Sequence, residues 1–115
     1  MNNDGVLFDL RNGVPELRPK EDSHCFFLVE HLGDKSFMSA VAQRLLNRKC
    51  KDFHFYGRYG GEWENAFDDT DIALYQNEDD WSLTSWWQSY DDFRETLEMQ
   101  IEIGEDVYFF FDTDL

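Results

Sequence analysis

Residues 24–56, HCFFLVEHLGDKSFMSAVAQRLLNRKCKDFHFY, decide the fold. They open with His24 to His31, whose continuous apolar centre is typical of a strand that is covered on both faces. They close with KDFHFY at residues 51–56, which predicts a second strand. Between the two, Asp34 is a suitable N-cap, and apolar residues recur at helical spacing, which predicts a helix from about Lys35 to Lys49. A strand, a helix and a strand in that order favour a parallel pair with a right-handed crossover.

The segment before this unit predicts a hairpin. Val6 to Leu10 and Val14 to Leu17 flank Arg11-Asn12-Gly13, and Asn-Gly between apolar segments is a hairpin signal. Pro15 limits the second arm to an edge strand or an irregular segment, because proline cannot donate to a ladder.

The segment after the unit predicts a short helix over about 62–67, with Trp63 and Phe67 on its inner face. Strands are predicted over 71–76 and 81–87, followed by a helix that Ser89 caps and Gly104 ends. A last strand over 106–111 is expected near the centre of the sheet. We therefore predict one α/β domain over residues 1–115, with a layered, mixed and mostly parallel sheet, flanking helices and an N-terminal β-hairpin.

Charge is divided unevenly along the chain. The formal net charge is −15, from 10 Lys and Arg against 25 Asp and Glu. Residues 1–57 carry eight basic and eight acidic residues, whereas residues 58–115 carry two basic and seventeen acidic ones. Such a field costs stability through self-repulsion, so solubility or a partner has to explain it. It disfavours binding to nucleic acid or an anionic membrane, and the 17% aromatic content excludes a disordered acidic tail.

The cysteines and the N-terminus bear on the compartment. No basic start with a following apolar run is present, and no apolar run is long enough to cross a membrane. Cys25 and Cys50 form no CxxC pair. We therefore expect a cytoplasmic protein with two reduced, largely buried thiols, and the alternatives are a disulfide or a catalytic thiolate.

No motif predicts a catalytic or metal site. The glycine run at 57–61 lacks the GxGxxG and P-loop patterns and precedes Glu62, which favours a turn with room for close backbone approach over a phosphate site. Residues 68–71 fail the EF-hand pattern, which leaves a solvated acidic loop or a weak site for a hard cation. The histidines form no HxxxH or HExxH pair, and His24 and Cys25 should point to opposite faces of their strand. We expect no catalytic residue, no metal and no cofactor.

Tryptophan and tyrosine accompany the acids of the second half. These residue types anchor interfaces, and an acidic field raises the rate of association with a basic protein. The predicted partner is therefore a basic protein. The candidate partner-binding residues are Trp63, Glu64, Asp68, Asp69, Asp71, Glu78, Asp79, Asp80, Trp86, Trp87, Tyr90, Asp91 and Asp92.

The segments WENAFDDTD (63–71) and 77–92 give the chain a character that resembles the immunity proteins of bacterial toxin systems, including contact-dependent growth inhibition. The resemblance implies a non-catalytic inhibitor that neutralises a basic toxin, such as a nuclease, by covering its active or substrate-binding surface. It implies nothing about architecture, because immunity families share no common fold. The stretch FHFYGRYGGEWENAFDDTD also looks like uncharacterised bacterial α/β domains.

Three hypotheses stay open on the sequence. The first is an immunity-type inhibitor of a basic toxin. The second is a DNA mimic or adaptor for another basic protein, which would space its acids like phosphates along a strip. The third is a small enzyme or ligand-binding domain, whose sign would be a deep pocket at the carboxyl ends of the parallel strands.

Overall fold

The computed structural model describes residues 6–17, 19–46, 50 and 52–114. Within these, strands β1 (Val6–Asp9), β2 (His24–Leu28), β3 (Asp52–Tyr56), β4 (Leu83–Trp86) and β5 (Val107–Phe111) form one sheet in the order β1-β5-β2-β3-β4. Every pair in that sheet is parallel. The α/β prediction is confirmed, including the parallel pair of β2 and β3.

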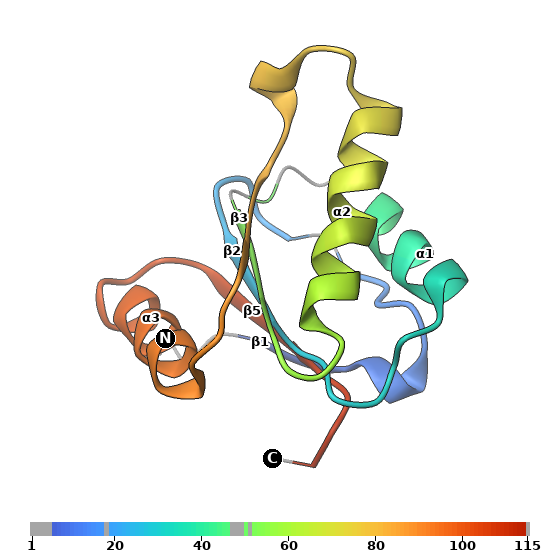
Figure 1. Ribbon diagram of the computed structural model, residues 1–115. Helices are drawn as coiled ribbons and strands as arrows, with labels where there is room; N and C mark the ends of the chain where they lie inside the picture. The colour runs from blue at the N-terminus through green and yellow to red at the C-terminus, as the bar shows by residue number, and fades with distance from the viewer. Residues whose placement is uncertain (1–5, 18, 47–49, 51, 115) are drawn as a thin grey trace.

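Helices cover both faces of the sheet. Helices α1 (Lys35–Leu46) and α2 (Gly60–Leu74) lie on one face, and α3 (Tyr90–Glu102) lies on the other (Figure 1). The chain moves from β2 to β4 with its helices on the first face and returns to β5 through α3 on the second. This arrangement follows from right-handed crossovers, since a reversal of direction across the sheet moves the helix to the opposite face.

The two faces have cores of unequal size. The larger core, under α1 and α2, contains the fully buried rings of Phe27, Phe53, Phe55 and Phe110. The smaller core, under α3, contains Phe26, Phe93 and Val107. Strand alternation produces the division, because successive side chains of a strand point to opposite faces.

The predicted thiols and caps lie where the sequence places them. Cys25 and Cys50 are both buried thiols, their Sγ atoms lie 3.1 Å apart, and burial raises the pKa of Cys25. The Oγ of Ser89 accepts the N–H of Asp92 and caps α3. Gly104 follows this helix with a φ of 88°.

Two predictions about the elements need revision. Helix α2 runs on to Leu74, so the predicted strand over 71–76 is wrong. Ile72 and Leu74 alternate as in a strand, but both are exposed, and the Thr70 Oγ1 bond to the Ala66 carbonyl belongs to a continuing helix. Strand β5 is interior, with neighbours on both sides, while β2 holds the middle of the sheet.

The N-terminal segment turns as a hairpin would, but its second arm is not a strand. After β1 the chain enters a short 3-10 helix, η1 (Leu10–Asn12), and then Gly13 at a φ of 113°. Residues 14–17 pair with no strand. Strand β1 instead pairs with β5 in parallel register. In addition, none of the described helices is both long and apolar enough to span a bilayer.

Candidate protein-binding surface

Three carboxylates line the side of α2 that borders strand β4. Glu64, Asp68 and Asp71 are spaced i, i+4 and i+7, which places them on one face of the helix. Thr84 and Trp86 lie beside Phe53 and Phe55 in the β3–β4 register, so their side chains point to the same face of the sheet as α2. We call this surface the α2–β4 seam; its residues are Glu64, Asp68, Asp71, Trp81, Ser82, Thr84 and Trp86.

Two hydrogen bonds join the sides of the seam. The Thr84 hydroxyl donates to Asp68 Oδ1 at 2.7 Å. The backbone N–H of Ser82 donates to Asp71 Oδ2 at 3.1 Å. Asp68 and Asp71 therefore face β4 and the segment before it, and they are not dispersed in solvent.

The indole of Trp86 lies over the first turn of α2. A Cβ atom added to Gly60 or Gly61 would approach this ring to 3.0 and 3.1 Å respectively. The glycines therefore give the ring room, which supports the interpretation of the run at 57–61 as a place of close approach. Trp86 still keeps 49% of its surface exposed, so it can contact a partner.

Asp71 is the most buried carboxylate of the seam. It is only 2% exposed, and its Oδ1 atom has no hydrogen-bond partner among the described residues. Burial, with a smaller contribution from the Asp68 charge, raises the pKa of Asp71 to about 6. Burial and the charge of Asp68 also raise the pKa of Glu64. The seam therefore holds carboxylates whose charge the fold disfavours.

Within the described part of the chain, no ion pair neutralises the seam carboxylates. The two arginines of the second half are used elsewhere: Arg58 lies over the Tyr59 ring, and Arg94 approaches Glu98 on α3. Because like charges on one helix face repel one another, this arrangement is unfavourable in the isolated protein.

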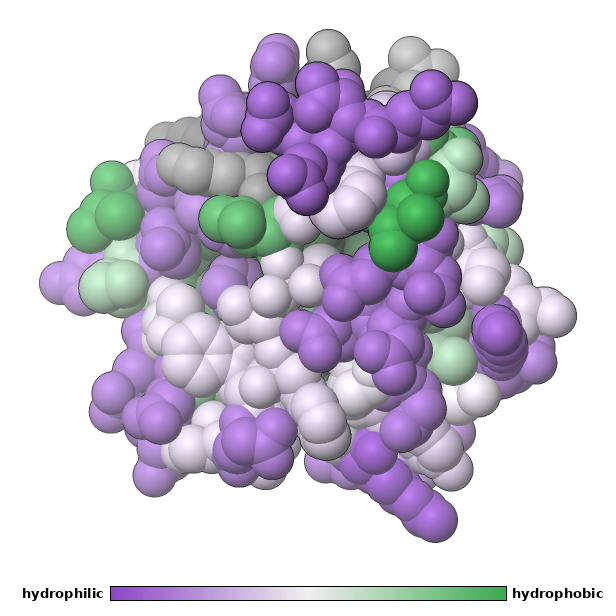
Figure 2. Space-filling model, turned by 45° about the horizontal axis from the view of Figure 1, so that its top comes forward, coloured by the Kyte–Doolittle hydropathy of each residue, from purple (hydrophilic) through white to green (hydrophobic). Residues whose placement is uncertain are grey.

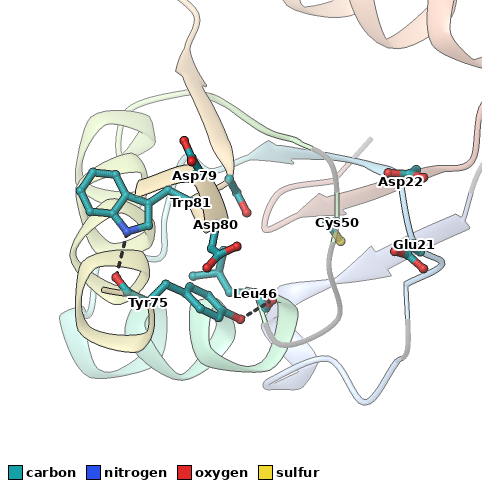
Figure 3. Close-up of a pocket in the computed structure, with 9 residues that line it drawn as sticks. Glu21, Asp22, Leu46, Cys50, Tyr75, Asp79, Asp80 and Trp81 are labelled. Atoms are coloured by element: carbon teal, nitrogen blue, oxygen red, sulfur yellow. Dashed lines mark hydrogen bonds between the residues drawn. The ribbon is translucent and has the colours of Figure 1, made fainter. Parts of the chain in front are cut away.

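Two hollows flank Trp81. The smaller, of about 330 Å³, is lined by Asp68, Asp71, Ile72, Trp81 and Ser82. The larger, of about 560 Å³, is lined by Tyr75 and Trp81 on one side and by Glu21 and Asp22 across from them, with Cys50 in between (Figure 3). The Trp81 indole N–H donates to the Tyr75 carbonyl at 3.0 Å, which fixes the ring between the two hollows.

The acidic turn beyond α2 is exposed. Glu78, Asp79 and Asp80 form a 3-10 helix, η2, and Asn77 Oδ1 accepts the N–H of Asp79 at its start. The turn projects past the end of the sheet (Figure 1). On the face shown in Figure 2, hydrophobic residues form separate small patches within a largely hydrophilic surface.

Several predicted residues do not lie on the seam. Trp63 was expected at the interface, but it is fully buried and its indole N–H donates to the Leu32 carbonyl, so a partner cannot reach it. Asp69 lies on the other side of α2, in a hollow with Lys35. Trp87 turns to the face covered by α3, where its N–H donates to His54 Nδ1 at 3.0 Å. The structure therefore places these three side chains away from the seam.

The remaining predicted residues lie at the start of α3. Tyr90 is 46% exposed, and its ring lies 5.5 Å from that of Tyr56. Asp91 and Asp92 occupy the first helical turn, where negative charge is favourable because the helix end is positive. Their charge thus has a local structural use, unlike that of the seam.

A His24–Asp52–His54 cluster lies at the amino-terminal ends of β2 and β3. His24 Nδ1 and His54 Nε2 each lie 2.9 Å from Asp52 Oδ1. Burial acts to raise the pKa of Asp52, but the hydrogen bonds from the two histidines outweigh it and the pKa is lowered. The sequence pattern did not reveal this cluster, because the residues meet only through strand register.

Although these three residues have metal-ligand types, their hydrogen bonds do not suit a metal. The Trp87 indole N–H donates to His54 Nδ1, which leaves the proton of a neutral imidazole on Nε2. A metal on Nε2 would move that proton to Nδ1, where it would oppose the Trp87 N–H. Both nitrogens of His54 are engaged inside the protein, so this ring is also unsuited to act as a general base.

The carboxyl ends of the central strands hold a buried aspartate. Asp112, directly after β5, accepts the N–H groups of Glu30, His31 and Leu32 at 2.8, 2.9 and 2.7 Å. In open parallel sheets, ligands bind outside the carboxyl ends of the strands, and clustered N–H groups bind their anions. The protein's own side chain occupies these donors, which disfavours a phosphate-type ligand there.

Comparison of the chain with protein-family models, with curated proteins and with solved structures finds no match.

Proposed function

We propose that this chain is a non-catalytic, acidic protein-binding inhibitor of the immunity type. Its partner in this proposal is a basic protein, specifically a cognate toxin domain with nuclease activity, whose active or substrate-binding surface the chain covers. The observation that carries the proposal is the α2–β4 seam, where carboxylates that have no cationic partner among the described residues border exposed indoles at the edge of the sheet.

In this proposal, the acidic residues speed association and the exposed tryptophans slow dissociation. The exposed acids of η2 and the more buried acids of the seam attract a basic surface over roughly 10 Å at ordinary salt and increase the association rate. Trp81 and Trp86, which are 38% and 49% exposed, can then bury apolar area and slow dissociation. A nuclease surface suits this arrangement, because it has to hold phosphates and is therefore basic.

Strand β4 strengthens the case for this edge. It pairs with β3 on one side and with no described strand on the other, and Leu83 on it is 69% exposed. An open edge that carries apolar residues is a hazard unless it is covered. A partner bound across the seam would cover the unpaired backbone of this edge, while the Leu83 side chain points to the opposite face of the sheet.

The proposal is tested by co-expression with the protein encoded directly upstream. We expect that protein to arrest growth when it is expressed alone, and this chain to bind it and restore growth. A partner that is basic but harmless to cells would favour the adaptor alternative, and failure to bind the upstream product would contradict the immunity proposal.

Stopped-flow kinetics on the resulting complex test the electrostatic part. Reversal of Glu78, Asp79 and Asp80 to Lys should slow association by roughly tenfold at low salt, with a smaller change in dissociation. The matched control reverses Glu95, Glu98 and Glu102 on α3, which changes the net charge equally. If both triple variants slow association by the same factor, the η2 turn lies outside the interface.

A further inference from the structure

The hollow beside Asp71 differs from an ordinary acidic surface in the burial of its charge. Asp71 is 2% exposed. Its Oδ2 atom accepts the Ser82 N–H, and its Oδ1 atom has no partner in the described structure. An unsatisfied buried acceptor costs stability, and an unpaired buried charge costs more. A cationic group that enters the hollow, which Asp71 lines, would offset the cost of this charge.

The composition of the hollow narrows the choice of cation. A hard metal ion such as Ca²⁺ takes six to eight oxygen ligands, but the hollow offers two carboxylates, Asp68 and Asp71, each of which already accepts one hydrogen bond. Trp81 forms one wall, and a planar guanidinium stacks on an indole better than a compact ammonium does. Two carboxylates one helical turn apart also match the several fixed donors of a guanidinium.

We propose that this hollow receives an arginine side chain of the partner, with its guanidinium between Asp68 and Asp71 and against the Trp81 ring. The inference rests on the proposed function, since it names the partner residue that the seam recognises. The hollow of about 330 Å³ has room for one such side chain. Arginine is also among the residues that dominate interface energetics.

The test uses NMR on the full chain, labelled with ¹⁵N, and needs no partner protein. N-acetyl-arginine amide is titrated at constant ionic strength, and the Ser82 amide and Trp81 indole N–H signals are followed. N-acetyl-lysine amide and CaCl₂ are titrated in parallel. We expect saturable shifts at both positions with the arginine probe, and binding at least about threefold weaker with the lysine probe.

Two variants separate the hollow from general charge attraction. Asp71→Asn keeps the size of the side chain and should weaken arginine binding by about tenfold or more. Asp92→Asn removes the same charge at the exposed start of α3 and should leave binding unchanged. The ¹⁵N spectrum of each variant confirms that it is folded before it is titrated.

Three results would overturn the inference: no saturable arginine shift, an Asp71→Asn variant that binds as the unaltered chain does, or a preference for lysine or Ca²⁺. Because the probe is a small molecule, its binding is independent of any toxin. Arginine binding without a basic protein partner would contradict the proposed function alone, and a basic partner without arginine binding would contradict this inference alone.

Discussion

Asp112 and Asp71 are both buried aspartates, but the structure treats their charges in opposite ways. Asp112 is fully buried and accepts three backbone N–H groups from the loop after β2. Asp71 is nearly as buried, accepts one N–H, and keeps an oxygen without a described partner. Three hydrogen bonds favour the charge of the first carboxylate, whereas burial disfavours the charge of the second.

The largest expected effect comes from Asp112. Asp112→Ala removes the acceptor of three N–H groups and leaves the donors of residues 30–32 without it, so the free energy of unfolding should fall by about 3 kcal/mol or more. Equilibrium urea unfolding at pH 7 measures the loss. A loss below about 1 kcal/mol would mean that water satisfies the loop as well as the carboxylate does.

A substitution of Asp71 should change the free energy of unfolding in the opposite direction. Asp71→Asn removes a charge that the fold disfavours, so the free energy of unfolding at pH 7 should rise by about 1 kcal/mol. The same urea experiment reports the gain, and the control Asp92→Asn, which removes a charge that favours the start of α3, should not stabilise the protein. If Asp71→Asn destabilises the protein, the carboxylate has a structural partner and the contrast with Asp112 fails.

The raised pKa of Asp71 and the lowered pKa of Asp52 also predict opposite effects of pH on stability. Because the folded pKa of Asp71 is raised from 3.8 to about 6, its contribution favours the fold below about pH 4 and is lost as the pH rises through about 6. The lowered pKa of Asp52 acts the other way, since its contribution is lost as the pH falls below 3.8. Thermal unfolding from pH 4 to 7 should show declining stability in the unaltered chain and a flatter profile for Asp71→Asn. Identical profiles would contradict this assignment.

A smaller effect is expected where Trp86 lies over α2. In Gly61→Ala the new Cβ lies 3.1 Å from the ring and must displace it, while alanine favours the helix by about 0.5–1 kcal/mol. The net change in stability should therefore be small. Tryptophan fluorescence should shift nevertheless, because the indole moves, and Trp86→Phe supplies the reference. An unchanged spectrum would show that the ring does not depend on the glycine.

The strand–helix–strand unit and the last helix follow from the sequence, because the apolar spacing and the Ser89 cap act locally. The extent of α2 was not predicted, since the alternation of Ile72 and Leu74 imitates a strand. That error hid the seam: the i, i+4, i+7 spacing of Glu64, Asp68 and Asp71 is visible in the sequence only once the helix is extended.

Other features depend on contacts that the sequence pattern does not contain. Trp63 resembles an interface residue by type and by its acidic neighbours, yet helical phase turns it into the core. The His24–Asp52–His54 cluster and the Asp112 contacts arise from strand register and loop closure. Asp71 differs from Asp68 and from the acids of η2 by its burial, which composition cannot reveal.

The most direct test of the central claim is a ¹³C NMR titration of the aspartate carboxyl carbons. The claim is that Asp71 carries a buried charge that no cation in the described part of the chain compensates. The account predicts that Asp71 titrates near pH 6 in the protein alone. A midpoint at or below its ordinary value of 3.8 would show that the protein already compensates this charge, and would contradict the account.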